Sequence, residues 1–378
     1  MTNLSPIFSP LTLNNGVSVP NRLVVAPMTH YASNPDGTLS DEECTFLAGR
    51  SADFGMFISA ATLVHPSGKA FHGQPAAYDE AHLPSLTETA NIIKQGGAKA
   101  ILQIHHGGYQ SLPDLVGEVI APSDVDDGKH KARAMSVDEI LAVIDGFGVA
   151  TDLAIRAGFD GVEIHGANNY LIQQFFSPQA NRRTDDWGGS LENRLRFPLS
   201  IIKKVNEIKD KHAKSDFIVG YRFSPEEAGE NGLTMADTFD LLDALSVQNL
   251  QYLHVSLWDF YKKARRGADT ERTRMALIHE RIAGKLPLIG VGCLLSADDV
   301  AKAYQTGWAE FVAVGKAVMI NPNFATLLKQ GKYEQISTSI DPERNDIYRI
   351  PALLWQYQQK GLAYLPPLKG KEWQPLDI

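Results

Sequence analysis

Three polar side chains follow directly on a short apolar run near the middle of the chain. The run is Gly161-Val-Glu-Ile164, and it is followed by His165, Asn168 and Tyr170. These residues supply an imidazole that can titrate near neutral pH, together with a carboxamide and a phenol that can donate hydrogen bonds. Because α/β enzymes carry their chemistry at the carboxyl ends of buried strands, this cluster predicts a catalytic or binding site.

The elements that position this cluster form an alternating series. Eight short apolar runs are typical of strands buried on both faces of a parallel sheet, and they cover residues 22–27, 56–61, 100–104, 161–164, 217–222, 252–256, 286–291 and 311–314. Amphipathic segments predict helices over residues 136–157, 190–209, 235–247, 273–283 and 296–306. The series predicts an α/β fold, a closed (β/α)8 TIM barrel. A doubly wound sheet would place a glycine fingerprint after the first strand, and the chain has Ala26-Pro-Met-Thr29 there.

We expect one domain over residues 1–378, with the barrel core over about residues 20–330. A hairpin around Asn15-Gly16 is expected to cap the bottom of the barrel. Long polar loops at 107–133, 168–189 and 258–272 follow strands three, four and six and are expected at the catalytic face. Residues 331–378 form a C-terminal extension with one expected helix over 347–360.

Composition excludes several classes of protein. The formal net charge is -8, which disfavours a nucleic-acid partner. Two cysteines, Cys44 and Cys293, rule out a disulfide framework and a four-cysteine iron–sulfur site. No secretory signal and no membrane-spanning run is apparent, so we expect a cytoplasmic protein with a small-molecule substrate. Whether the chain forms a homo-oligomer is left open.

The expected strand ends also argue against two kinds of barrel chemistry. They carry no carboxylate cluster with metal-ligand spacing, so we expect no metal. They also carry no lysine on strand six that could form a Schiff base, which disfavours aldolases.

Two further groups of strand-end residues favour a flavin. Gly292, Gly315 and Lys316 end strands seven and eight, where barrels of this type hold a phosphate. Small Ala60 and Ala61, with the amide of Gln103 and the guanidinium of Arg222, suit a flat ring with a polar edge. An isoalloxazine fits this set because its N1–C2=O edge becomes more negative on reduction.

The chain also resembles a known family, the Old Yellow Enzyme family of FMN-dependent oxidoreductases, over nearly its whole length. The resemblance rests on Pro20-Asn-Arg-Leu-Val-Val-Ala-Pro-Met28, on Ile104-His-His-Gly-Gly108 with Gln103 in register, and on the run from Asn181 to Arg194. The last motif, Asn-Arg-Arg-Thr-Asp-Asp-Trp-Gly-Gly-Ser-Leu-Glu-Asn-Arg, is the most specific of the three.

The resemblance implies a role for individual residues. FMN would be held by residues equivalent to Pro27, Met28, Thr29, Ala61, Gln103, Arg222, Gly292, Gly315 and Lys316. His165 and Asn168 are similar to the pair that grips an acceptor carbonyl, Tyr170 to the proton donor and Tyr31 to a pocket residue. Lys316 departs from the arginine that is commoner at the phosphate, which replaces a bidentate fork by a point charge.

The implied function is transfer of a hydride from NADH or NADPH to FMN and then to an activated alkene. The alternative left open is a flavin-binding redox protein that does not turn over enones. The sequence does not choose between NADH and NADPH, identify the physiological acceptor, or say whether a C-terminal residue enters a neighbouring subunit's site.

Overall fold

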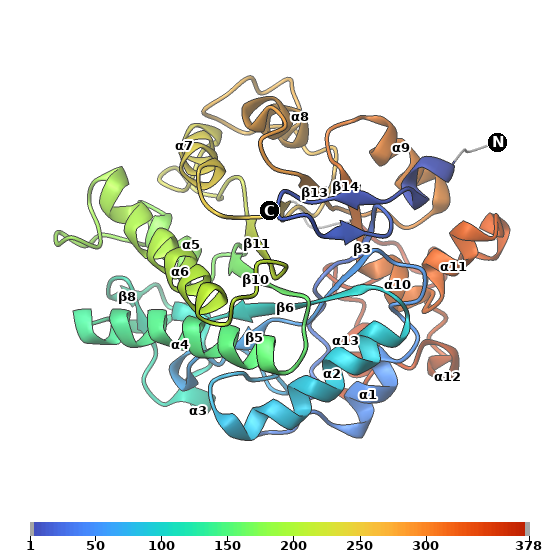
Figure 1. The fold of residues 1–378 in the computed structure, drawn as a ribbon, viewed down its shortest axis with the longest axis horizontal. Coiled ribbons are helices and arrows are strands. Elements are labelled where there is room, and N and C mark those ends of the chain that lie inside the picture. Colours follow the sequence, from blue (N-terminus) through green and yellow to red (C-terminus); the bar gives the residue numbers. More distant parts are fainter. Residues whose placement is uncertain (1–3, 375–378) are drawn as a thin grey trace.

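The computed structural model describes residues 4–374, and eight parallel strands form a closed barrel surrounded by helices (Figure 1). The order around the barrel is β10-β11-β12-β13-β14-β3-β4-β6, and β6 pairs with β10 to close the ring. The barrel strands are β3 (Leu23–Val25), β4 (Met56–Ile58), β6 (Lys99–His105), β10 (Gly161–Gly166), β11 (Ile218–Phe223), β12 (Tyr252–Val255), β13 (Leu288–Gly290) and β14 (Phe311–Val314). The predicted TIM barrel and all eight predicted strands are confirmed.

The outer helices are α1 (Asp41–Leu47), α2 (Leu83–Gln95), α4 (Val137–Arg156), α6 (Leu191–Lys211), α7 (Met235–Ser246), α8 (Arg274–Ile282) and α9 (Ala297–Gln305), with α10 (Lys316–Ile320) and α11 (Phe324–Lys329) after β14. Six of these, namely α1, α4, α6, α7, α8 and α9, begin after a serine or threonine whose side chain accepts from a backbone N–H of the first turn. The predicted capping box before α4 is present, since Ser136 accepts from the Glu139 backbone N–H and Glu139 bonds back to Ser136. All five predicted helices are therefore confirmed, with ends within two residues of those expected.

The N-terminal hairpin closes the bottom of the barrel as predicted. Strands β1 (Leu11–Thr12) and β2 (Ser18–Val19) pair antiparallel, and Gly16 takes the left-handed conformation of the turn at φ 84°. Leu13 and Val19 pack into the apolar cluster inside the barrel. Asn14 Nδ2 donates to the Leu250 carbonyl just before β12, at 2.7 Å, which fixes the hairpin to the barrel rim.

The loop after β6 is more ordered than the sequence indicates. Instead of one polar loop, it contains the short helix α3 (Pro113–Val116) and three short strands, β7 (Ile120–Ala121), β8 (Val125–Asp126) and β9 (Lys131–Ala134). Strand β7 pairs parallel with β9, and β8 pairs antiparallel with β9. A further short strand, β5 (Thr62–Leu63), pairs with the end of β6, and the short helix α5 (Leu171–Phe176) follows β10.

The C-terminal extension corrects one prediction. The single helix expected over 347–360 is two helices, α12 (Asn345–Tyr348) and α13 (Ala352–Gln359). Arg349 turns left-handed at φ 52°, and Pro351 cannot donate an N–H and disfavours helical backbone in the residue before it. Residues 1–3 and 375–378 of the predicted domain lie outside the described residues. Within residues 4–374, no helix is both long and apolar enough to cross a membrane.

Candidate active site

The carboxyl ends of the barrel strands open into one cavity of about 1030 Å³. Most of the predicted site residues line it, namely Pro27, Met28, Thr29, Tyr31, Asn168, Tyr170, Arg222, Gly292, Gly315 and Lys316. Ala61, Gln103 and His165 are not among the lining residues and are buried beneath it. A cavity of this size is at the upper end of the range for small-molecule and cofactor sites.

The imidazole of His165, near the end of β10, has a defined protonation state. Its Nδ1 accepts a hydrogen bond from the Ala167 backbone N–H at 3.3 Å, so the proton of the neutral ring is on Nε2. Burial lowers the pKa of His165 well below its usual value, and the nearby His105 and Arg222 lower it further. His165 is therefore neutral at pH 7 and can donate a hydrogen bond through Nε2.

Asn168 is held on its backbone and on its side chain. Its backbone is left-handed at φ 57°, and its N–H donates to Ser224 Oγ at 2.9 Å. Its side-chain Oδ1 accepts from Ser256 Oγ at 2.7 Å. Because Oδ1 is occupied by the serine, the amide presents its Nδ2 hydrogens as donors at the cavity wall.

The Tyr170 phenol lies against two histidine rings. Its centroid is 4.3 Å from that of His105 and 5.2 Å from that of His165, and both contacts are edge-on. Burial raises the pKa of Tyr170, and the positive charge of Arg222 partly opposes this shift. The hydroxyl thus stays protonated at neutral pH, as a proton donor requires.

A buried polar layer connects the strands below the cavity. Glu163 accepts hydrogen bonds from Gln103 Nε2 at 2.7 Å, from Tyr252 OH at 3.1 Å and from His254 Nδ1 at 2.9 Å. Although burial alone would favour the neutral acid, the charges and donors around Glu163 lower its pKa. The layer fixes Gln103, which the sequence assigns to the cofactor, from underneath.

The Arg222 guanidinium is buried and only partly paired. Its Nη2 donates to Ser256 Oγ at 3.1 Å, while its Nε is buried and has no hydrogen-bond partner within the described residues. A buried, unpaired guanidinium N–H is costly unless a ligand satisfies it. Arg222 therefore fits the polar edge of a ring that gains negative charge.

The opposite end of the cavity has the features of an anion site. Gly292 has φ 143°, and a Cβ there would come within 2.4 Å of the Phe260 nitrogen, so no side chain fits. Lys316 Nζ lies 4.9 Å from the centre of the Trp258 ring and 5.6 Å from that of Trp373, and within residues 4–374 it makes no ion pair with a carboxylate. Burial lowers the pKa of this lysine, which disfavours its charged form. A bound phosphate would favour the charged form again and pair with it.

The C-terminal extension contributes a wall to the same cavity. Tyr364 and Leu365 line it, and the Tyr364 hydroxyl shares a hydrogen bond with that of Tyr31. Tyr31 is left-handed at φ 57° and packs edge-on against Tyr357, 5.1 Å between centroids. The extension of this chain thus reaches its own site.

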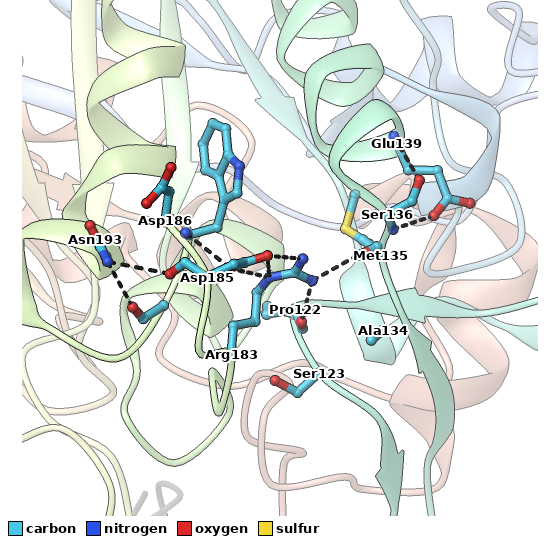
Figure 2. Close-up of polar contacts among 12 residues, drawn as sticks. Pro122, Ser123, Ala134, Met135, Ser136, Glu139, Arg183, Asp185, Asp186 and Asn193 are labelled. Carbon is cyan, nitrogen blue, oxygen red and sulfur yellow. Dashed lines mark hydrogen bonds and ion pairs between the residues drawn. The ribbon is translucent and has the colours of Figure 1, made fainter.

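The loop from Asn181 to Arg194 is hydrogen-bonded to neighbouring segments, and Figure 2 shows the contacts of its Arg183 and Asp185. The Arg183 guanidinium donates to the Pro122 carbonyl at 2.9 Å and the Met135 carbonyl at 2.7 Å, and it is also paired with Asp185. Arg194 Nε donates to the Phe176 carbonyl at the end of α5, the helix that Tyr170 caps. These contacts join the segments that follow β6 and β10, and they give this specific motif a structural task.

These features fit FMN. The unpaired Arg222 Nε suits the ring edge, Gly292 and Gly315 line the cavity without side chains, and the partly buried Lys316 makes no ion pair with a carboxylate within residues 4–374. Pro27, Met28 and Thr29 would lie along the ring between these two ends. In the described part of the chain, no cluster of three or more His, Cys, Asp or Glu side chains is arranged to hold a metal ion.

Sequence reasoning did not find Ser256, Glu163 or Tyr364. Ser256 ends a predicted strand, and its position beside Arg222 and Asn168 follows from strand pairing between β11 and β12. Glu163 is an acid within an apolar run, a pattern that marks a buried partner. Tyr364 is far from the barrel in the sequence, and no local pattern indicates where it packs.

Comparison with known proteins gives a consistent result. Residues 6–335 match the model of the NADH:flavin oxidoreductase / NADH oxidase family. The chain is 51% identical over 364 residues to a probable NADH-dependent flavin oxidoreductase, YqiG, of Bacillus subtilis, covering 96% of this chain and 98% of the relative. It is 36% identical over 361 residues to the NADH:acrylate oxidoreductase of Vibrio harveyi, covering 93% of this chain but only 36% of that protein.

A solved structure shows the same architecture with a nucleotide analogue bound. Morphinone reductase in complex with tetrahydroNAD superposes with a TM-score of 0.71 at 29% identity, covering 86% of this chain and 90% of that one. The likeness therefore extends over almost the whole barrel.

Proposed function

The chain belongs to the NADH:flavin oxidoreductase / NADH oxidase family and is an FMN-dependent oxidoreductase, and we propose that its electron acceptor is an activated alkene, an α,β-unsaturated carbonyl compound or a similar electrophile. The observation that carries the proposal is the grouping of His165, Asn168 and Tyr170 at the carboxyl end of β10, where Asn168 and Tyr170 line the cavity and the buried His165 ring lies against the Tyr170 ring. The group consists of a neutral imidazole, an amide and a protonated phenol. An acceptor whose oxygen becomes negative and whose carbon needs a proton uses all three.

When bound, FMN supplies the redox step, the exchange of a hydride between NADH or NADPH and the acceptor. Arg222, Gly292 and Lys316 would hold the cofactor, and Met28 and Thr29 would lie along its ring, since all five residues line the cavity. The Gln103 amide donates to the buried Glu163, and this bond would fix the amide beneath the ring.

The donors His165 Nε2 and Asn168 Nδ2 would bind the acceptor oxygen and stabilise the negative charge that builds on it. Donors fixed before the reaction contribute most to such stabilisation, and removing one costs on the order of 100- to 1000-fold in rate. The bonds from Ala167 N–H to His165 and from Ser256 to Asn168 are those that fix them here.

Tyr170 would deliver the proton to the acceptor carbon. Its hydroxyl is protonated throughout the neutral range because burial raises its pKa. The edge-on contacts with His105 and His165 hold the Tyr170 ring in one orientation at the cavity wall.

A three-step assay tests the proposal. We expect purified protein to bind FMN and turn yellow, to bleach anaerobically with NADH or NADPH, and to regain its colour when 2-cyclohexenone is added. Bleaching without recovery by any enone, nitroalkene or unsaturated carboxylate would overturn the acceptor class and leave a flavin-binding redox protein. The description of the Bacillus relative as NADH-dependent supports NADH as donor, and a stopped-flow comparison of NADH with NADPH measures the preference.

A further inference from the structure

Ser256 connects Arg222, which we assign to the cofactor, with Asn168, which we assign to the electron acceptor. It follows β12 and lines the cavity, and its hydroxyl lies between Arg222 Nη2 at 3.1 Å and Asn168 Oδ1 at 2.7 Å. A guanidinium only donates and an amide oxygen only accepts, so the serine hydroxyl accepts from Arg222 and donates to Asn168.

The three groups form a chain of hydrogen bonds that runs in one direction. It starts at the positive guanidinium, passes through the serine hydroxyl and ends at the amide of Asn168, a residue that lines the cavity. Hydrogen bonds aligned in this way polarise one another, and the buried Arg222 guanidinium supplies the charge at the start of the series. The positive charge of Arg222 therefore makes Asn168 Nδ2 a stronger donor.

We propose that Ser256 is a positioning residue for the electron acceptor, which fixes the Asn168 amide with Nδ2 toward the acceptor oxygen and transmits to it the polarising effect of Arg222. The proposal rests on the acceptor class stated above, since it concerns the oxygen of that acceptor. Without the serine hydroxyl, the Asn168 side chain loses the bond that selects one of its two amide orientations. Its backbone stays in place because Ser224 still holds the N–H.

A positioning role for Ser256 and a purely structural role predict different effects when the serine is replaced. A merely structural serine would affect stability and FMN uptake together. A positioning residue that acts through Asn168 instead weakens binding of an oxyanion ligand, and it does so only while Asn168 is present.

The test uses the FMN-loaded protein and a phenolate ligand, 4-hydroxybenzaldehyde, whose binding is followed by equilibrium dialysis. We expect Ser256→Ala to raise the dissociation constant about tenfold, as for loss of one charge-assisted hydrogen bond. Ser256→Thr keeps a hydroxyl and should restore most of the affinity. Ser246→Ala removes an exposed serine hydroxyl on α7 and serves as the matched control.

A double-mutant cycle decides whether Ser256 acts through Asn168. We expect Ser256→Ala to change ligand affinity by less than about twofold when Asn168 is already alanine, within the usual error of additivity. An undiminished tenfold effect in that background would overturn the proposal. So would a Ser256→Ala protein that loses FMN but binds the phenolate normally when saturated with the cofactor.

The outcome is distinguishable from failure of the proposed function. The phenolate does not accept a hydride, so its affinity is measured whether or not the wild-type protein reduces enones. Loss of enone turnover in the wild type would remove the acceptor class, whereas an unchanged phenolate affinity in Ser256→Ala would remove the role of Ser256.

Discussion

The ring of Tyr170 meets the ring of His105 edge-on, with 4.3 Å between centroids and 86° between planes. His105 is itself fixed, because its Nδ1 accepts from Gln74 Nε2 at 3.0 Å. Gln74 also donates to the carbonyl of Ala61, so the Tyr170 phenol is oriented by a series of contacts that reaches the segment after the second barrel strand.

Replacing Tyr170 by phenylalanine tests the phenol as proton donor. We expect Tyr170→Phe to slow reoxidation by 2-cyclohexenone on the order of 100-fold or more, which is typical for loss of a general acid. Bleaching by NADH should change only a few-fold, because that step needs no proton from the phenol. Stopped-flow absorbance measures both steps, and Tyr261→Phe, at an exposed tyrosine, is the control. Equal slowing of both steps would contradict the assignment.

Replacing Lys316 tests the phosphate site. We expect Lys316→Ala to weaken FMN binding roughly 10- to 100-fold, because this change removes a partly buried cation that would pair with the phosphate. Lys316→Arg should bind FMN at least as tightly as the wild type, since guanidinium offers a bidentate fork. Fluorescence titration with FMN gives the dissociation constants. Lys360→Ala removes a lysine that contacts the Tyr357 ring at 5.3 Å and should leave them unchanged.

Gly292 should tolerate no side chain. Gly292→Ala places a Cβ against the Phe260 nitrogen and the Asp259 carbonyl carbon, at 2.4 and 2.6 Å, and we expect a loss of roughly 3 kcal/mol or more in the free energy of unfolding. Gly307→Ala is a matched control, since Gly307 also has positive φ (70°) but no atom lies within 4 Å of the place where its methyl group would be. It should cost only about 1–2 kcal/mol of backbone strain. Urea denaturation measures both, and equal losses would show that Gly292 is not closely packed.

Three buried histidines predict a loss of stability in acid. Burial lowers the pKa of His105 to about 3, and those of His106 and His165 also lie well below 6.5. As the pH falls below 6.5, the unfolded chain takes up protons that the folded chain does not, so the folded state loses up to about 1.4 kcal/mol per pH unit for each histidine. The stabilising effect is complete above pH 6.5 and is lost progressively as the pH falls toward 3.

Replacing one of these histidines should reduce that dependence. We expect His105→Gln to reduce the slope of the unfolding free energy against pH between pH 6 and 4. The reduction should be up to about 1.4 kcal/mol per pH unit, which corresponds to uptake of one proton fewer on unfolding. His72→Gln, at an exposed histidine, should leave the slope unchanged. Urea denaturation at several pH values provides the measurement, and parallel plots for His105→Gln and wild type would show that His105 titrates normally in the folded state.

The barrel could be predicted from the sequence because each element carries its own local signal. The strands are short apolar runs, and helices such as α4 begin at capping residues such as Ser136. The order of the strand ends then placed Asn168, Arg222 and Lys316 around one opening. The cofactor and the family could be named because three motifs are specific enough to identify them.

What could not be predicted depends on contacts between residues far apart in the chain. Ser256 has no motif of its own, and its role appears only when β11 and β12 lie side by side. The break at Arg349 to Pro351 follows from proline, but the left-handed turn there also depends on how the extension packs onto α10. Tyr364 reaches Tyr31 because of that packing, which no local pattern determines.

The hairpin that closes the bottom of the barrel has a kinetic consequence. With Leu13 and Val19 packed at that end, the cavity opens at the side of the strand ends, and we expect the nicotinamide donor and the proposed alkene acceptor to enter by the same opening. We therefore expect parallel lines in double-reciprocal plots, the pattern of ping-pong exchange. An excess of either compound should slow turnover, so the flux through the enzyme would follow the ratio of donor to acceptor as well as their total supply.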